Sequence, residues 1–298
     1  MLPNVVIVGA QKAATTFLQR GLQDHPEAKV IPGETETFSD PTYGPIALRE
    51  LESSFEGSDA KRVRVIKNAE YLTKPEVPAR LRKHLSGARL IAVLRDPVAR
   101  LLSAYYHLIK YNKLPHVHHE EGIPKVLDGK WSDHYPVSAS LLDNGRYATG
   151  LRRYYDEFPK EQVLCFLHED VASDSLGALK SVYRFLEITE DHTTANLRRR
   201  SQAVVYSLPR LRLLSLRNPF CFQRTPTGSR MRGGPLAKLA WYGGEFVDRA
   251  LFAKVWGNQK PFLSDNLAAR LYDVFREEVE ALESLLGRDL NHWKHRAA

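Results

Sequence analysis

Short apolar runs alternate with amphipathic stretches along the first two-thirds of the chain. The runs occupy residues 5–8, 63–67, 89–94 and 163–167. Mostly apolar runs of this length are typical of strands buried on both faces of a parallel sheet. Between them, apolar residues recur at helical spacing, as at Phe17, Leu18 and Leu22. Alternating strands and helices predict an α/β fold with a mainly parallel central sheet.

The first strand leads into a turn of small residues that predicts an anion site. Gly9 to Ala14 form the turn, and a helix is expected from Thr15 onward. This arrangement gathers backbone N–H groups at the positive end of a helix, where phosphate commonly binds. The turn departs from the Gly-x-x-x-x-Gly-Lys-Ser/Thr loop, because the lysine stands three residues earlier, at Lys12. The candidate phosphate-binding residues are Gln11, Lys12, Ala13, Ala14, Thr15 and Thr16.

A second strand–helix junction carries an arginine and a serine. Arg95 ends the apolar run, Asp96 is suited to cap the next helix, and Pro97 is suited to its first position. Ser103 follows about two turns into that helix. A guanidinium and a hydroxyl at the same strand end suit a terminal phosphate.

Composition and charge narrow the class of protein. The chain has 298 residues, 43 basic and 35 acidic, and a net charge of +8. This excess favours an anionic ligand, a nucleic acid or a membrane surface. Two cysteines exclude a disulfide scaffold, and no apolar run approaches the roughly 20 residues of a membrane span. Because the first strand follows Met1 almost at once, no signal peptide is expected, and we predict a cytoplasmic protein.

These motifs resemble the PAPS-dependent sulfotransferases, where PAPS is 3′-phosphoadenosine-5′-phosphosulfate. The resemblance is to bacterial-type enzymes related to the glycan and heparan sulfate branch, and it covers residues 5–293, weakly over 198–259. It rests on the phosphate turn, on the Arg-Asp-Pro junction with Ser103 eight residues after Arg95, and on the closing segment 286–293. It implies a three-layer fold like that of the P-loop nucleoside triphosphate hydrolases, with a C-terminal helical elaboration. We expect one sulfotransferase domain over 1–298, with a helical, basic insert at about 203–260.

The resemblance also implies roles for individual residues. The turn would bind the 5′-phosphosulfate, and Arg95 with Ser103 would bind the 3′-phosphate. Lys67, which ends a strand, would be a second cation beside Lys12 facing the sulfuryl group. Lys260 would lie near the cofactor phosphates. No metal is required, because protein cations replace magnesium.

The general base is expected in the polar loop 32–40. Aligned on Phe38 and Ser39, Glu34 falls on the family's catalytic glutamate. The loop departs from the family pattern at residues 33, 36 and 37, and Glu36 is a rival base. As a candidate base, His107 ranks below Glu34.

Other functions remain open at this stage. A P-loop small-molecule kinase is disfavoured by the position of Lys12, and zinc binding at 116–121 by the lack of cysteine and of an HExxH pattern. The basic, aromatic region 198–260, with helical patterns near 208–216 and 236–255, suits a lid, a nucleic-acid surface or a membrane-surface patch. We expect a carbohydrate, glycolipid or secondary-metabolite acceptor, sulfated on a hydroxyl rather than an amine, and no nucleic acid. Peripheral membrane contact and the oligomeric state are left open.

Overall fold

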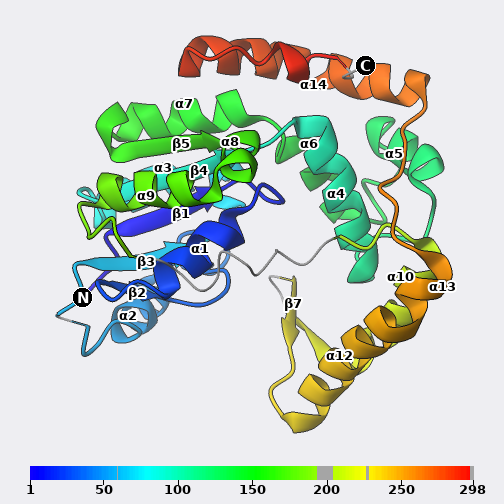
Figure 1. Cartoon of the computed structure of the whole chain (residues 1–298), viewed down its shortest axis with the longest axis horizontal. Coiled ribbons are helices and arrows are strands. Elements are labelled where there is room, and N and C mark those ends of the chain that lie inside the picture. The colour runs from blue at the N-terminus through cyan, green and yellow to red at the C-terminus, as the bar shows by residue number, and fades with distance from the viewer. Residues whose placement is uncertain (59, 193–203, 226–227, 296–298) are drawn as a thin grey trace. The chain divides into compact units, whose positions relative to one another are not determined.

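Five short parallel strands form the main sheet (Figure 1). The strands are β1 (Val5–Gly9), β2 (Ala28–Val30), β3 (Val63–Lys67), β4 (Arg89–Leu94) and β5 (Val163–Leu167). Their order is β2-β3-β1-β4-β5, and every neighbouring pair is parallel. All residues of β1, and all of β4 after Arg89, are buried. The predicted mainly parallel sheet is therefore confirmed.

The computed structural model describes residues 1–58, 60–192, 204–225 and 228–295. These fall into two compact units. The first unit comprises Met1–Arg100, Asn144–Gln202 and Phe275–Lys294. The second comprises Leu101–Asp143, Ala203–Val274 and His295–Ala298. The sheet lies entirely in the first unit. The extent of the sulfotransferase domain, predicted as 1–298, stays a prediction.

Helices flank the sheet of the first unit. They are α1 (Thr15–Gln23), α2 (Pro45–Ser53), α3 (Val77–His84), α7 (Tyr147–Glu157), α8 (His168–Ser173) and α9 (Ser175–Leu186), with 3₁₀ turns at Tyr71–Thr73, Lys160–Gln162 and Asn291–Trp293. The connection through α1 runs toward β2, whereas those through α3 and α7 run toward β5. Right-handed crossovers in opposite directions place helices on opposite faces, which gives the three layers expected.

Close packing ties the helices to one another within each outer layer. On one side, the Tyr183 hydroxyl donates to the Gly21 carbonyl at 3.2 Å, which joins α9 to α1. A Cβ at Gly21 would lie 2.5 Å from Leu179, so only glycine allows this approach. On the other side, the buried Tyr154 hydroxyl of α7 donates to the Tyr71 carbonyl at 2.9 Å. These contacts fix α9 on α1 and α7 on the turn that follows β3.

The second unit is mostly helical. It holds α5 (His119–Leu127), a 3₁₀ turn (Pro136–Ala139), α6 (Ser140–Asp143), α10 (Leu208–Ser215), α11 (Asn218–Cys221), α12 (Pro235–Val247), a π-helical turn (Asp248–Phe252) and α13 (Ala253–Trp256). The helices expected near 208–216 and 236–255 are present. The insert also contains an unpredicted antiparallel hairpin, β6 (Phe222–Thr225) with β7 (Gly228–Met231). The basic run 198–200 lies outside the described residues.

Two helices continue from one unit into the other. They are α4 (Pro97–Lys110) and α14 (Asp265–Leu286). The helix α14 begins at Asp265, and Gly287 follows it with a φ of +63° and donates to the Glu283 carbonyl at 2.8 Å. Over the described residues, each helix is too short or too polar to cross a membrane. The cytoplasmic location stays a prediction.

Candidate functional site

The turn between β1 and α1 is built from residues in unusual backbone conformations. Lys12 and Ala14 have φ values of +67° and +74°. Left-handed residues inside such a turn direct successive peptide N–H groups toward one point, which makes a concave anion site. Gly9 enters the turn against residues 69–72, and a Cβ there would lie 2.9 Å from Leu72 Cβ. The turn is therefore packed firmly on the segment that follows β3.

The other residues predicted to bind phosphate in this turn differ in how far they are buried. Ala13 and Thr15 are buried, whereas Gln11 and Thr16 are half-buried. The Gln11 side-chain amide donates to a Glu70 carboxylate oxygen at 2.9 Å. The turn and the residues after β3 thus share polar contacts as well as packing.

Lys67, Glu34 and Thr16 meet at the end of β3. Lys67 is only 3% exposed, and its ammonium group forms an ion pair with Glu34. The same Nζ donates to Thr16 Oγ1 at 3.3 Å. The second carboxylate oxygen of Glu34 accepts from the Ala69 N–H at 2.8 Å. A carboxylate, a buried cation and a hydroxyl of the turn therefore form one cluster.

Arg95 brings the end of β4 to the same turn. Its Nη1 donates to the Lys12 carbonyl at 3.1 Å. Asp96 caps α4 by accepting from the Val98 N–H at 2.8 Å, as predicted. Burial raises the pKa of Asp96, although its hydrogen bonds oppose the shift. The two predicted phosphate-binding strand ends are thus in direct contact.

The other predicted residues lie in the second unit. Ser103 is 1% exposed on α4, and its hydroxyl oxygen has no hydrogen-bond partner among the described residues. Lys260 is exposed in the connection between α13 and α14. His107 lies on α4 with its ring centroid 4.8 Å from that of Tyr111. The roles of Ser103 and Lys260 stay predictions.

Glu34 and Glu36 differ in their surroundings. Glu36 contributes its backbone carbonyl, which accepts from the Ser39 N–H at 3.0 Å and from its hydroxyl at 3.1 Å. Its side chain is exposed. Glu34, in contrast, is bound to Lys67 and Ala69, so Glu34 is the acid attached to the cluster.

Buried polar residues that sequence reasoning gave no role hold the Glu34 loop. The Gln19 amide donates to the carbonyls of Ile31 and Gly33, both at 2.9 Å. The Asn68 amide donates to the Thr35 carbonyl at 3.1 Å. For Asn68, only its polar character directly after a strand could have indicated this role.

Tyr71 closes the other side of the same loop. Its buried hydroxyl accepts from the Phe38 N–H at 3.1 Å. Burial raises the pKa of Tyr71 well above its usual value, so the hydroxyl is neutral. Sequence periodicity could not show that this tyrosine supports the loop, because its partner lies 33 residues away.

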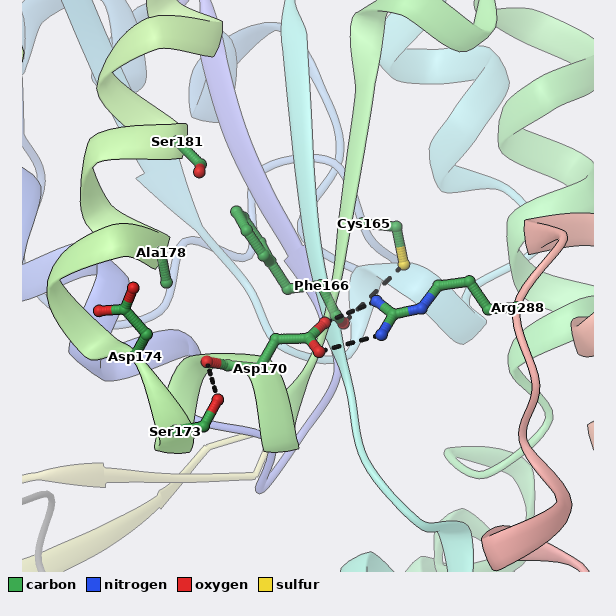
Figure 2. A pocket seen from close by; sticks show the side chains of 8 residues that line it. All are labelled: Cys165, Phe166, Asp170, Ser173, Asp174, Ala178, Ser181 and Arg288. Carbon is green, nitrogen blue, oxygen red and sulfur yellow. Dashed lines mark hydrogen bonds and ion pairs between the residues drawn. The ribbon is translucent and has the colours of Figure 1, made fainter.

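A separate pocket of about 470 Å³ lies along β5, α8 and α9 (Figure 2). In Figure 2, Arg288 reaches from the segment after α14 to Asp170, and the two side chains form two hydrogen bonds of 2.6 and 2.9 Å. Burial raises the pKa of Cys165 in this pocket to about 12, so its thiol is protonated and a poor nucleophile. The predicted catalytic and cofactor-binding residues do not line this pocket.

Comparison with known proteins identifies the family. The family described as "Sulfotransferase domain" matches residues 2–234. The chain belongs to the sulfotransferase family. The resemblance inferred from the sequence is confirmed. The expectation that the chain is an enzyme of this family is confirmed as well.

Curated relatives of this sulfotransferase cover part of it. Mouse heparan sulfate glucosamine 3-O-sulfotransferase 3A1 is 29% identical over 197 residues, which are 64% of this chain and 48% of that protein. The membrane-associated sulfotransferase kil1 of Dictyostelium discoideum is 33% identical over 133 residues, 40% of this chain and 28% of that protein. The chain spans about half the length of the first of these relatives. A sulfotransferase crystal structure from Alicyclobacillus acidocaldarius, 21% identical, superposes with a TM-score of 0.69 over 99% of this chain and 100% of that one, which confirms the fold.

Proposed function

We propose that this sulfotransferase moves a sulfuryl group from PAPS to a hydroxyl of a carbohydrate, glycolipid or secondary metabolite. The observation that carries the proposal is the contact between Arg95 and the Lys12 carbonyl. It joins the anion-binding turn of β1 to the arginine at the end of β4. A nucleotide with phosphate at both its 5′ and 3′ positions suits such a pair of strand ends.

Several features of the chain fit PAPS. The left-handed residues Lys12 and Ala14 shape the turn for an anion. Ser103 keeps a buried hydroxyl without a partner among the described residues, and such a group is commonly completed by a ligand. PAPS supplies a sulfuryl group already activated by attachment to a phosphate. The turn residues 11–16 would hold its 5′ end, and Arg95 with Ser103 its 3′-phosphate, with Lys260 near the phosphates.

Glu34 is proposed as the general base. Its side chain is 46% exposed, so an acceptor hydroxyl has access to it. The ion pair with Lys67 and the hydrogen bond from Ala69 fix the carboxylate, which must reach the hydroxyl proton at hydrogen-bond distance. Lys67 also contacts Thr16 of the turn, so the base is held at a set distance from the phosphate-binding residues.

Lys12 and Lys67 are proposed to stabilise negative charge during transfer. Fixed cations lower a barrier most where water is excluded, and Lys67 is almost fully buried. Protein cations would then serve as magnesium does in phosphoryl transfer, so no metal is invoked. Within the described residues, the acidic, histidine and cysteine side chains do not gather in threes as a metal site would need.

A carbohydrate is the favoured acceptor class. Among curated relatives, the names of the mouse 3-O-sulfotransferase and of a Caenorhabditis elegans heparan sulfate N-deacetylase/N-sulfotransferase both refer to a glycan. The first is 29% identical and the second 24% over stretches of similar length, which favours a hydroxyl over an amine.

The test is a transfer assay with PAPS, EDTA and a panel of glycan, glycolipid and phenolic acceptors. We expect the desulfated nucleotide, 3′-phosphoadenosine-5′-phosphate (PAP), to form only when an acceptor is present. Glu34→Gln is the control, because PAP formation that depends on the proposed base should fall in this variant. Absence of PAP with every acceptor, together with magnesium-dependent consumption of ATP, would instead select a small-molecule kinase.

A further inference from the structure

The positive charge of the chain is concentrated in one segment. Residues 204–264 contain ten basic and two acidic residues, a net charge of +8, which equals that of all 298 residues. The segment belongs to the second unit, and of the residues proposed for the transfer reaction it contains Lys260 alone.

Both acids of this segment are buried and neutralised within the second unit. Asp248 accepts from Arg210 Nε at 2.8 Å and from Nη2 at 2.7 Å. Glu245 accepts from Lys110 Nζ at 2.8 Å and also pairs with Arg217. The described surface of residues 204–264 therefore presents basic groups without acidic ones.

The packing of Arg217 turns the polar side of α12 inward. Its guanidinium lies 4.0 Å from the ring centroid of Trp241 and donates to the Trp241 carbonyl at 2.8 Å. A Cβ at Gly244 would lie 2.5 Å from Arg217 Nη1, so the glycine makes room for this contact. Glu245 and Trp241 thus occupy the inner side of α12, and Asp248 is buried directly after its end, whereas acids usually lie on the outer side of a helix.

Large apolar side chains occupy the outer side of α12. Leu236, Leu239, Tyr242 and Phe246 follow one another at intervals of three or four residues, and each is at least 67% exposed. This spacing places them on one face of the helix, here called the outer face. Single exposed apolar residues are common on proteins, but a continuous row marks an interaction site. Other exposed apolar residues of the second unit include Leu216, Phe220, Leu251 and Val255.

We propose that the outer face of α12 docks this protein onto an anionic lipid bilayer, with its apolar residues among the acyl chains and the surrounding basic residues at the headgroups. Within residues 204–264 the exposed charges that accompany this apolar helical face are all cationic, which is the chemistry of an interfacial helix. Lys238 and Arg249 are exposed on and directly after α12. They match the negative potential of a membrane containing acidic lipid.

The same features disfavour two other occupants. A second copy of the chain would bring two surfaces of like charge together, which opposes association. A single-stranded nucleic acid binds through a series of stacking side chains, and only Tyr242 and Phe246 of the four residues in the row are aromatic. Both occupants are outcomes of the test below.

The full chain is mixed with sedimenting vesicles of phosphatidylcholine alone or with 30% phosphatidylserine. We expect at least tenfold stronger binding to the acidic vesicles, weakened by salt. Leu239→Ser with Phe246→Ser should lower it at least tenfold. The matched control, Ile46→Ser with Leu176→Ser, changes exposed apolar residues of α2 and α9 and should leave it within twofold.

A second pair of variants tests the charge. Each basic residue near an acidic membrane contributes roughly fivefold to binding, so Lys238→Gln with Arg249→Gln should lower it about 25-fold. Arg49→Gln with Lys83→Gln, at exposed positions in the first unit, is the control. Circular dichroism and thermal melting report that each variant is folded.

Three results would overturn the proposal. The first is no binding to acidic vesicles, or binding that the Leu239 and Phe246 substitutions leave unchanged. The second is a dimer in light scattering that the same substitutions dissociate, because the outer face would then bind a second copy. The third is single-stranded RNA binding lost in Tyr242→Ala while vesicles remain unbound.

Discussion

Replacing Glu34 by glutamine tests the proposed base directly. The substitution keeps the size of the side chain and an oxygen that accepts one hydrogen bond, from either Lys67 or Ala69, but it removes the charge. Loss of a general base typically costs about 10²- to 10⁴-fold in kcat. That corresponds to about 2.7–5.4 kcal/mol of barrier, at about 1.36 kcal/mol per factor of ten. PAPS affinity should stay near that of the wild type, because the proposed phosphate contacts come from other residues.

The structure also sets the expected effect on stability. Removing one partner of a fully buried ion pair costs about 3–5 kcal/mol. Lys67 is 3% exposed but Glu34 is 46% exposed, so water screens the pair and we expect a loss of only about 1–2 kcal/mol. This loss is a fraction of the roughly 5–15 kcal/mol by which folded proteins are typically stable, so we expect the variant to stay folded at 25 °C and a fall in kcat to report chemistry.

The assay is initial-rate PAP release at saturating PAPS, together with thermal melting of each variant. Glu36→Gln is the matched control. It removes the same charge from a side chain that lies two residues from Glu34 and is not paired with Lys67. It should keep kcat within about twofold of the wild type. If Glu36→Gln loses activity and Glu34→Gln keeps it, the assignment of the base is wrong.

Three further substitutions test other parts of the account. Arg95→Ala should weaken PAP binding about 10- to 100-fold in calorimetry, because a charge-assisted hydrogen bond contributes about 1.5–3 kcal/mol; unchanged affinity would contradict the role of Arg95. Gly9→Ala should lower the free energy of unfolding by about 1–3 kcal/mol, because its Cβ would lie 2.9 Å from Leu72 Cβ. Gly87→Ala is the control, since open space surrounds that position and no loss is expected. Equal denaturation midpoints for the two variants would refute the prediction. Burial lowers the pKa of His119, so its contribution to stability is full above the unfolded pKa of about 6.5 and falls as the pH drops below that value. His119→Gln should therefore flatten the fall in melting temperature between pH 7 and pH 5.5. An unchanged slope would exclude His119 as the source of that fall.

The parts of the fold predicted from sequence are those encoded by local pattern. The apolar runs gave the buried strands, and Asp96 with Pro97 gave the start of α4. Gly287 directly after α14 is a local signal of the same kind, because its left-handed conformation suits the residue after a helix. In each case the decisive interaction lies within a few residues of the signal.

The remainder depends on contacts between distant residues. The inward orientation of Glu245 and Asp248 depends on Lys110, Arg217 and Arg210, and helical periodicity alone would have placed the apolar residues of α12 inside. The ion pair between Lys67 and Glu34 joins residues 33 positions apart. Such pairs follow from the arrangement of the strands, so the sequence indicated the residues but not their partners.

The central claim is that the turn after β1 and Arg95 after β4 bind one nucleotide that carries phosphate at both ends. Isothermal titration calorimetry of the whole chain in EDTA tests it most directly, with PAP, adenosine 5′-phosphosulfate and ATP as ligands. The account predicts one PAP per chain and at least tenfold weaker binding of the two nucleotides that lack a 3′-phosphate. Equal affinity for ATP and PAP, or no heat with PAP, would contradict it.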